Sequence, residues 1–292
     1  MALSFLRSLW GRRGPERSSA SSDPAPLSSP SQSAAKLGKR SSWHVTVVGC
    51  GDAFGAGGRL QTSYHLRTPQ GQVLLDCGAT TLLGLEREKI DPNAIGTILI
   101  THLHGDHFGG LIWWLMHAHY VTGRTQPLTI IGPAGLYDRL QTATEAFFPG
   151  SSSIDPRFQV TYLEFADRVP LAIGDDITVT PFEVHHPSGA PAYAVRVEGG
   201  GRSVSFSGDT EWIDSLVACA AGTDLMIIDC FGFENDVGFH MSWKTISSRL
   251  GVLSASRIML THMGPEMLRR RGEVSNPRVL LASDGLVVDI PG

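Results

Sequence analysis

Short apolar runs alternate with longer amphipathic segments along most of the chain. The runs predict strands at WHVTVVGCG, TSYHLRTPQGQVLLDCG (two strands), IGTILIT, PLTIIGP, FQVTYLEF, DITVTPFEV, AYAVRVEG, RSVSFSGD, DLMIIDCF, RIMLTHM and GLVVDI. Helices are predicted at TTLLGLERE, FGGLIWWLMHAHYV, GLYDRLQTATEAFF, EWIDSLVACAA and WKTISSRLGVL. Hairpins stand beside strand–helix–strand units, so the pattern predicts an α/β fold of two sheets with helices packed outside them.

Residues 1–42 lack this pattern. Serine, proline and alanine dominate RGPERSSASSDPAPLSSPSQSAAKLGKR, and such a segment cannot bury enough apolar surface to offset the entropy cost of ordering it. We therefore predict a disordered Ser/Pro-rich tail over residues 1–42 and one folded domain over residues 43–292. The first ten residues, MALSFLRSLW, lie near arginines and resemble an organellar presequence in composition, which leaves import as an alternative to the cytoplasmic location that we expect.

Composition and charge argue against some classes of partner. The 292 residues carry a net charge of −4, which gives the protein no general attraction to nucleic-acid phosphates. The apolar stretch at the N-terminus is too short to cross a bilayer, so no membrane partner is expected. Cys50, Cys77, Cys219 and Cys230 are far apart and form no C-x-x-C pair, which favours buried free thiols over disulfides or a thiolate metal site.

Histidines and aspartates gather where predicted strands end. The stretch THLHGDH, residues 101–107, places three imidazoles and a carboxylate directly after the apolar run IGTILI. His102 and His104 are separated by one residue and face the same side of an extended segment. Asp106 and His107 follow the glycine turn and face a second position. A solvated loop rich in histidine would explain this stretch if it stood alone.

Three further predicted strands also end in residues that can bind a metal. FEVHHPSG supplies His185 and His186, VSFSGDT supplies Asp209, and RIMLTHMG supplies His262. The strand ends of a sandwich meet at a common rim, so we expect these side chains to converge on one cleft. Imidazole and carboxylate without thiolate suit Zn²⁺, with Mn²⁺ or Fe as alternatives. Two ions about 3.5–4 Å apart would activate a shared water for hydrolysis.

The motif THLHGDH resembles the H-x-H-x-D-H signature of the metallo-β-lactamase superfamily, and the later histidines and aspartate follow that family's ligand order. The resemblance extends from about Trp43 to Asp289. It implies a four-layer αβ/βα sandwich, the metallo-β-lactamase fold, with a site for two Zn²⁺ ions. In this scheme one ion is held by His102, His104 and His186, and the other by Asp106, His107 and His262, while Asp209 and a hydroxide bridge the two.

Two assignments rest on the resemblance to the ribonuclease Z-like and small-phosphodiesterase branch. His186 is preferred to His185 as the ligand because the ligand of that branch lies seven residues before an aromatic residue, here Tyr193. His185 would then point towards the sheet or a residue behind the metal. His240 in FHMSW resembles an extra histidine of the branch, which could donate a proton to the leaving oxygen. The alternative for His240 is a structural role beside a helix that Ser242 caps.

The branch resemblance, and the departures from it, narrow the expected function. We expect a dinuclear phosphodiesterase that cleaves a small linear or cyclic phosphodiester by attack of a metal-bridging hydroxide, with Asp106 and His240 as candidate catalytic residues. The region between AFFPG and VPLAIG is too short for the arm with which ribonuclease Z grips tRNA, and no basic patch would attract RNA. A tRNA substrate is therefore not expected. The resemblance allows a homodimer, because dimers are common among ribonuclease Z relatives.

Three other functions stay open on the sequence alone. A ribonuclease Z-like RNA endonuclease would show a basic groove and binding that weakens steeply with salt. A mononuclear iron oxidoreductase of the persulfide dioxygenase type would use one metal position and consume oxygen. A binding protein without catalysis could retain the fold, but the complete set of ligand residues argues against that function.

Overall fold

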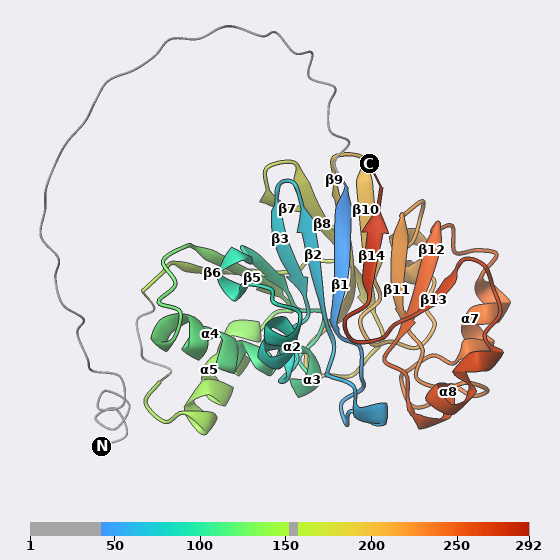
Figure 1. The fold of residues 1–292 in the computed structure, drawn as a ribbon, viewed down its shortest axis with the longest axis horizontal. Helices are drawn as coiled ribbons and strands as arrows, with labels where there is room; N and C mark the ends of the chain where they lie inside the picture. The colour runs from blue at the N-terminus through green and yellow to red at the C-terminus, as the bar shows by residue number, and fades with distance from the viewer. Residues whose placement is uncertain (1–41, 152–156, 292) are drawn as a thin grey trace, which may run out of the picture.

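The computed structural model describes residues 42–151 and 157–291. The tail predicted to be disordered, residues 1–42, lies outside these ranges except for Ser42, and the boundary between tail and domain stays a prediction. The described residues form two mixed sheets that pack face to face, with helices on the outside (Figure 1).

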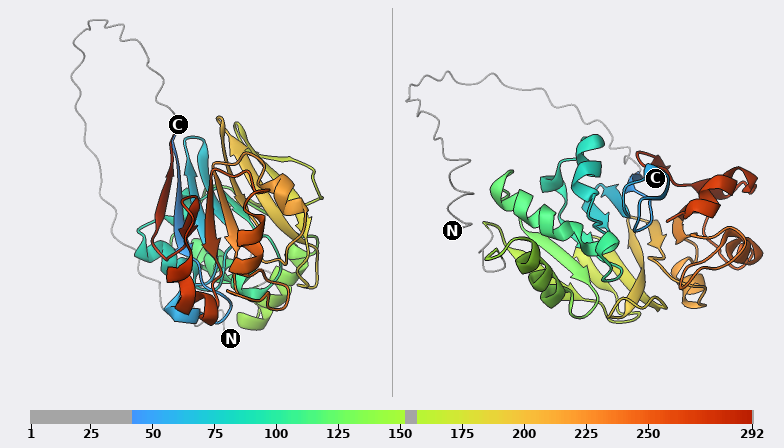
Figure 2. Two further views of the ribbon diagram at one scale, coloured as in Figure 1. Left: turned by 90° about the vertical axis from the view of Figure 1, so that its right-hand side faces the viewer. Right: turned by 90° about the horizontal axis from the view of Figure 1, so that it is seen from below.

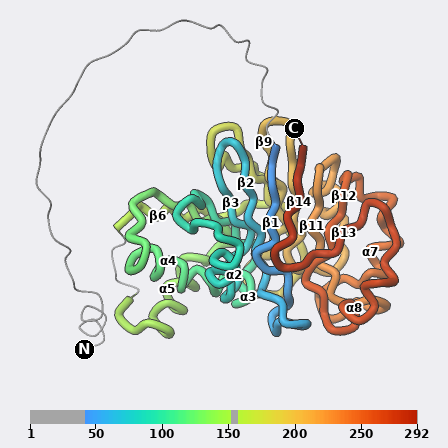
Figure 3. The backbone as a smooth tube through the Cα atoms, in the orientation of Figure 1, coloured from blue at the N-terminus to red at the C-terminus, as the bar shows by residue number. Residues whose placement is uncertain are grey.

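The first sheet has seven strands in the order β14-β1-β2-β3-β4-β5-β6. These are β1 (Trp43–Gly49), β2 (Ser63–Thr68), β3 (Gly71–Leu75), β4 (Thr97–Leu99), β5 (Leu128–Gly132), β6 (Val160–Glu164) and β14 (Val287–Ile290). The strands from β14 to β3 pair antiparallel, whereas those from β3 to β6 pair parallel. The last described strand therefore lies beside the first (Figure 3).

The second sheet repeats this plan with the order β13-β12-β11-β10-β9-β8-β7. Its strands are β7 (Leu171–Gly174), β8 (Ile177–Val184), β9 (Ala192–Gly199), β10 (Arg202–Phe206), β11 (Leu225–Asp229), β12 (Arg257–Thr261) and β13 (Val279–Leu281). The strands from β7 to β10 pair antiparallel and those from β10 to β13 pair parallel. In each sheet the parallel half directs the carboxyl ends of its strands to one rim.

Helices cover the outer faces and complete the four layers (Figure 2). They are α2 (Thr81–Arg87), α3 (Gly105–Phe108), α4 (Gly110–Tyr120) and α5 (Leu136–Phe147) on the first sheet, and α6 (Ser215–Cys219), α7 (Trp243–Arg249) and α8 (Pro265–Arg270) on the second. The short turns η1 (Ala56–Gly58), η2 (Pro92–Ala94) and η3 (Arg271–Glu273) lie between them. Buried apolar residues form one cluster between the sheets and one between each sheet and its helices. The predicted αβ/βα sandwich is confirmed.

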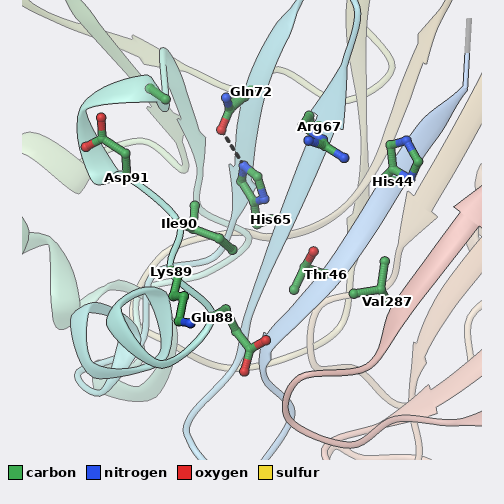
Figure 4. A pocket seen from close by; sticks show the side chains of 11 residues that line it. His44, Thr46, His65, Arg67, Gln72, Glu88, Lys89, Ile90, Asp91 and Val287 are labelled. Atoms are coloured by element: carbon green, nitrogen blue, oxygen red, sulfur yellow. Dashed lines mark hydrogen bonds between the residues drawn. The ribbon is translucent and has the colours of Figure 1, made fainter.

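Alternation along β1 and β2 decides which side chains reach the core. Val45 and Val47 pack between the sheets, whereas His44 points to the opposite face. On that outer face, a polar pocket of about 340 Å³ lies beside the end of α2 (Figure 4). Within it, Nε2 of His65 lies 2.7 Å from Oε1 of Gln72. Neither His44 nor His65 belongs to the groups of predicted ligands at the strand ends.

Some elements differ from the prediction. β7, β13 and α8 were not predicted because each has only three to six residues, too few for a periodic pattern to show. α6 covers only Ser215–Cys219 of the predicted run Glu211–Ala221, and Gly222 at φ 67° turns the chain away after it. In the part of the chain that the structure describes, no helix combines the length and the apolar character needed to cross a membrane.

The four cysteines are free and buried, as predicted from their spacing. Burial raises the pKa of Cys50 and of Cys77 to about 12, which keeps both thiols protonated at neutral pH. The sulfur atoms therefore act as small packing groups rather than as thiolate ligands.

Candidate metal centre

The predicted ligands come together at one rim of the sandwich. They follow β4, β8, β10 and β12 or belong to α3, so segments distant in the sequence contribute to one cluster. Their ligand atoms form two groups, and within each group all atoms lie within 4.8 Å of one another. The first group is His102, His104 and His186, and the second is Asp106, His107, Asp209 and His262.

The three imidazoles of the first group face one another. Nε2 of His186 lies 3.0 Å from Nδ1 of His104, and the ring centroids of His102 and His186 are 4.7 Å apart. Among the described residues, Nε2 of His102 has no hydrogen-bond partner although it is buried. Burial lowers the pKa of His102 well below its ordinary value and that of His186 to about 4. Both rings are therefore neutral, which is the form that binds a metal.

The second group brings carboxylates against imidazoles. Nε2 of His107 lies 3.4 Å from Oδ2 of Asp106 and 3.2 Å from Oδ2 of Asp209. Nε2 of His262 lies 3.4 Å and 3.3 Å from the same two oxygens. Burial would raise the pKa of Asp209, but His107 and His262 lower it well below the usual carboxyl range. Ionised carboxylates in a buried site favour a cation between these groups.

Oδ2 of Asp209 lies between the two groups. In addition to its contacts in the second group, it is 3.8 Å from Nε2 of His102 and 3.9 Å from Nε2 of His186, which belong to the first. A carboxylate oxygen shared in this way is what a bridging ligand requires. All seven donors are nitrogen or oxygen, a set that suits Zn²⁺ and also Mn²⁺ or Fe. The residues present therefore fit two divalent cations.

Asp76, which follows β3, orients His107 from behind. Oδ2 of Asp76 lies 2.6 Å from Nδ1 of His107, and the same carboxylate accepts hydrogen bonds from the amide and the hydroxyl of Thr101 at 2.7 Å and 2.8 Å. A carboxylate at Nδ1 holds the ring proton on that nitrogen and directs Nε2 towards the second group. Nε2 of His107 has no hydrogen-bond partner within the described structure, so its lone pair is available to a metal.

Sequence reasoning missed Asp229, the last residue of β11. Its Oδ2 lies 2.9 Å from Nδ1 of His240, and its Oδ1 lies 3.8 Å from Nδ1 of His262. The carboxylate is fully buried, and burial raises its pKa. Although burial lowers the pKa of His240, the charge of Asp229 raises it to about 9. The sequence did carry a weak sign of this residue: Asp229, like Asp76, comes at the end of a buried apolar run.

A pocket of about 300 Å³ opens beside these histidines. It is lined by His186, His240 and His262, by Phe231, Val237, Gly238 and Phe239 from the loop after β11, and by Asp52, Ala53 and Phe54 from the loop after β1. Phe54 is 93% exposed and Phe239 is 40% exposed, so apolar surface at the mouth is free to contact a bound molecule. None of the described residues that line this pocket is a lysine or an arginine.

His185 does not join the site. Its side chain is 55% exposed, and its Nδ1 lies 2.5 Å from Oε1 of Glu211 at the surface. The expectation that His185 points towards the sheet or a residue behind the metal is therefore wrong. Its neighbour His186 turns the other way, towards His104, because successive residues of an extended segment face opposite sides.

Comparisons with known proteins agree with this fold. An uncharacterized protein of Mycobacterium tuberculosis is 27% identical over 230 residues, which cover 76% of this chain and 81% of that protein. The crystal structure of the metallo-β-lactamase fold protein YhfI from Bacillus subtilis aligns with a TM-score of 0.67 at 22% identity, covering 84% of this chain and 99% of YhfI. The short form of human tRNase Z aligns with a TM-score of 0.67 at 25% identity, covering 84% and 98%.

These relatives confirm the resemblance that the motif THLHGDH indicated: the chain has the metallo-β-lactamase fold and is similar to hydrolases of the ribonuclease Z-like branch. A more specific match covers most of the described residues. The family described as Anti-Pycsar protein Apyc1 matches residues 43–282, and the chain belongs to that family.

Proposed function

We propose that this protein is a metal-dependent phosphodiesterase that cleaves a small linear or cyclic phosphodiester. The observation that carries the proposal is the meeting of two ligand groups at Oδ2 of Asp209, with Nδ1 of His240 only 4.0 Å from that oxygen. Phosphodiester hydrolysis with two metal ions needs two cation positions that share a ligand, and it gains from a separate acid beside them.

The seven predicted ligands would hold two Zn²⁺ ions, with Mn²⁺ or Fe as alternatives. His102, His104 and His186 would hold one ion, Asp106, His107 and His262 the other, and Asp209 would bridge them. When bound, the ions supply a water of lowered pKa and stabilise charge on the phosphate oxygens. The chain supplies rigidity, because six of these seven side chains are buried. Asp106 is also a candidate catalytic residue, because its carboxylate lies near both His107 and His262.

His240 is the proposed proton donor. Hydrolysis forms a bond from the attacking water oxygen to phosphorus and breaks the bond from phosphorus to the leaving oxygen, which then needs a proton. Asp229 occupies Nδ1 of His240, and this leaves Nε2 to donate. The raised pKa of His240, about 9, keeps the imidazole protonated at neutral pH. Its ring is held between Phe231 and His262, with centroid distances of 5.2 Å and 5.1 Å.

The pocket favours a small substrate. Its volume of about 300 Å³ is at the lower end of the range for small-molecule sites. Its apolar walls lack the lysine and arginine side chains that bind successive phosphates of a polynucleotide. We therefore propose that the substrate is a small molecule rather than tRNA. No membrane partner is proposed. The proposal does not depend on the homodimer or on the cytoplasmic location that the sequence leads us to expect.

RNA endonuclease action is the second candidate. The alignment with the short form of human tRNase Z favours it, because that enzyme has the same fold at 25% identity. The small apolar pocket speaks against it. Binding of a folded RNA that weakens steeply between low and high salt would support the endonuclease, since each phosphate contact releases counterions.

Metal content and diesterase activity should be measured on the same preparation. The proposal predicts two equivalents of Zn or Mn by elemental mass spectrometry, and hydrolysis of bis(p-nitrophenyl) phosphate that a chelator abolishes and Zn²⁺ restores. One equivalent of iron, oxygen consumption with a persulfide and no hydrolysis would overturn it in favour of the oxidoreductase alternative.

A further inference from the structure

One loop carries much of the site. Residues 231–242, here called the His240 loop, connect β11 to α7 and supply His240 together with Phe231, Val237 and Phe239 of the pocket wall. The backbone oxygen of Phe239 also lies 3.3 Å from Nδ1 of His186, where it can accept a hydrogen bond from the ring N–H. The position of this loop therefore affects both the proton donor and a proposed metal ligand.

The C-terminal part of the His240 loop is fixed by its own residues. The carboxylate of Asp236 accepts a hydrogen bond from the Ser242 amide at 2.7 Å and one from the Thr245 hydroxyl at 3.0 Å. The Ser242 hydroxyl in turn accepts from the Thr245 amide at 3.2 Å and caps α7. These contacts tie the C-terminal part of the loop to α7. The N-terminal part, residues 231–234, is joined to it by backbone hydrogen bonds: the Gly232 amide donates to the Met241 carbonyl at 3.2 Å, and the Gly232 and Phe233 carbonyls accept from the Trp243 and Lys244 amides at 2.9 Å each. A shift of residues 231–234 is therefore passed on to the stretch that carries His240.

That N-terminal part is also held from the other side, by α8 and the residue before it. The amide of Gly264 donates to the Phe231 carbonyl at 3.0 Å, and the Phe233 amide donates to Oε2 of Glu266 at 3.3 Å. The guanidinium carbon of Arg270 lies 3.8 Å from the ring centroid of Phe233, a close cation–π contact. Nη1 of Arg270 also donates to Oε1 of Glu234 at 2.9 Å.

Arg270 is itself held in one orientation. Its Nε and Nη2 donate to the two carboxylate oxygens of Glu273 at 2.8 Å and 2.7 Å, which is a bidentate pair. α8 is anchored in turn by Met267, which is fully buried against the second sheet. A single exposed ion pair contributes little, but a ring contact, a bidentate pair and a further ion pair on one guanidinium fix its geometry.

We propose that Arg270 is a positioning residue for His240: it holds Phe233 and Glu234 against α8 and thereby sets where the His240 loop presents the proton donor. This inference rests on the proposed role of His240 in the phosphodiesterase. A lysine in place of Arg270 would keep the charge but lose both the planar contact with Phe233 and the bidentate pair. Loss of the anchor should therefore impair proton donation more than substrate binding.

The test compares two diesters of similar shape. p-Nitrophenolate leaves from bis(p-nitrophenyl) phosphate without needing a proton, whereas phenolate, a stronger base, leaves diphenyl phosphate more easily when it is protonated. For Arg270→Met we expect kcat on diphenyl phosphate to fall about tenfold. This is less than the roughly 100-fold or more that a general acid contributes, because His240 is displaced but still present. We expect little change in kcat on bis(p-nitrophenyl) phosphate or in either KM. Arg270→Lys should lie between wild type and Arg270→Met, and Glu234→Gln should shift kcat in the same direction.

Arg168→Met is the matched control. Arg168 also lies over a phenylalanine, at 5.5 Å from the ring centroid of Phe182, and it also pairs with an acid, Asp167, but it has no contact with the His240 loop. This variant should leave both rates unchanged. Amide hydrogen exchange across residues 231–242, metal content and melting temperature should be measured for every variant. Exchange should accelerate in Arg270→Met and not in Arg168→Met, with metal content equal to that of the wild type.

The possible failures can be told apart. If Arg270→Met lowers both rates equally, or leaves loop exchange unchanged, Arg270 does not position His240. If His240→Ala itself slows the two diesters equally, the proposed proton donor is wrong, while the exchange data still decide whether Arg270 holds the loop. Should Arg270→Met lower the melting temperature sharply, the milder Glu234→Gln decides the question, because it removes the carboxylate charge that faces Arg270 and Lys244 and leaves Arg270 and Glu273 in place.

Discussion

Oδ2 of Asp229 lies 2.9 Å from Nδ1 of His240, and the aspartate is fully buried while the imidazole reaches the pocket. A carboxylate in this position selects the tautomer of the ring and stabilises its protonated form. The same carboxylate accepts a hydrogen bond from the Thr210 amide at 3.3 Å, one residue after the proposed bridging ligand Asp209. Asp229 therefore contacts both the proposed acid, His240, and the backbone next to the proposed bridging ligand, Asp209.

The first prediction concerns Asp229. Asp229→Asn should lower kcat on diphenyl phosphate about 100-fold, because the amide no longer stabilises the imidazolium that donates the proton. Metal content should stay near the wild-type value, since Asp229 belongs to neither of the two proposed ligand groups. Steady-state kinetics with elemental analysis checks both statements. Loss of one equivalent of metal in Asp229→Asn would instead make this residue a ligand, within the cluster that it forms with Asp209, His240 and His262.

The second prediction separates ligands from bystanders. Asp209→Ala and His104→Ala should each lose metal and turnover, because Asp209 joins the two groups and His104 belongs to the group of three imidazoles. His185→Ala is the matched control: it removes an imidazole one residue from a proposed ligand, but one that is exposed, paired with Glu211 and packed edge-on against Phe239. It should keep full metal content. Full activity in Asp209→Ala would show that the site assignment is wrong.

The third prediction concerns Asp76. In Asp76→Asn the group behind His107 no longer holds a negative charge, so the affinity for metal should fall about 10- to 100-fold, as is usual when the partner of a ligating histidine is changed. Competition with a chromogenic chelator measures this change. Activity should return at high Zn²⁺ concentration, since the ligands themselves are intact. Activity that stays low under saturating metal would show that Asp76 does more than orient His107.

The sequence predicted part of the proposed ligand cluster because its signal is local. His102, His104, Asp106 and His107 stand within six residues, and together with the metal-binding residue types at three further strand ends they favour a shared metal ion over a solvated histidine-rich loop. The fold followed for a similar reason, because most strands and helices are long enough to show a period. The remaining candidates, His186, Asp209 and His262, were found because they follow predicted strands, whereas the choice of His186 over His185 rested on the resemblance to a known family.

Other parts of the site could not be predicted, since they depend on contacts between distant residues. Asp229 ends an apolar strand, but many structural aspartates share that pattern, and its distance to His240 is what distinguishes it from them. The His240 loop has no periodic pattern, and its anchor Arg270 lies about 30 residues further along the chain, in a helix too short to predict. The exposure of Phe54 runs against the rule that places phenylalanine in the core.

The last prediction uses that exception. The loop that carries Phe54 is held by the buried Asp52, whose Oδ1 accepts hydrogen bonds from the amides of Phe54 and Ala56 at 3.1 Å and 2.8 Å. A rigid loop that presents a 93% exposed ring at the pocket mouth offers a preformed apolar contact for a substituent of the substrate. Phe54→Ala should therefore raise KM for bis(p-nitrophenyl) phosphate about tenfold, the loss expected for one apolar contact of this size.

The same change should leave kcat, metal content and melting temperature unaltered, because an exposed ring contributes little to folding. Phe147→Ala, which removes a 60% exposed phenylalanine from α5, is the matched control and should leave KM unchanged. Equal KM values for wild type and Phe54→Ala would mean that the substrate enters without touching this loop. The pocket would then be entered from the side of Phe239, and Phe239→Ala would be the variant that raises KM.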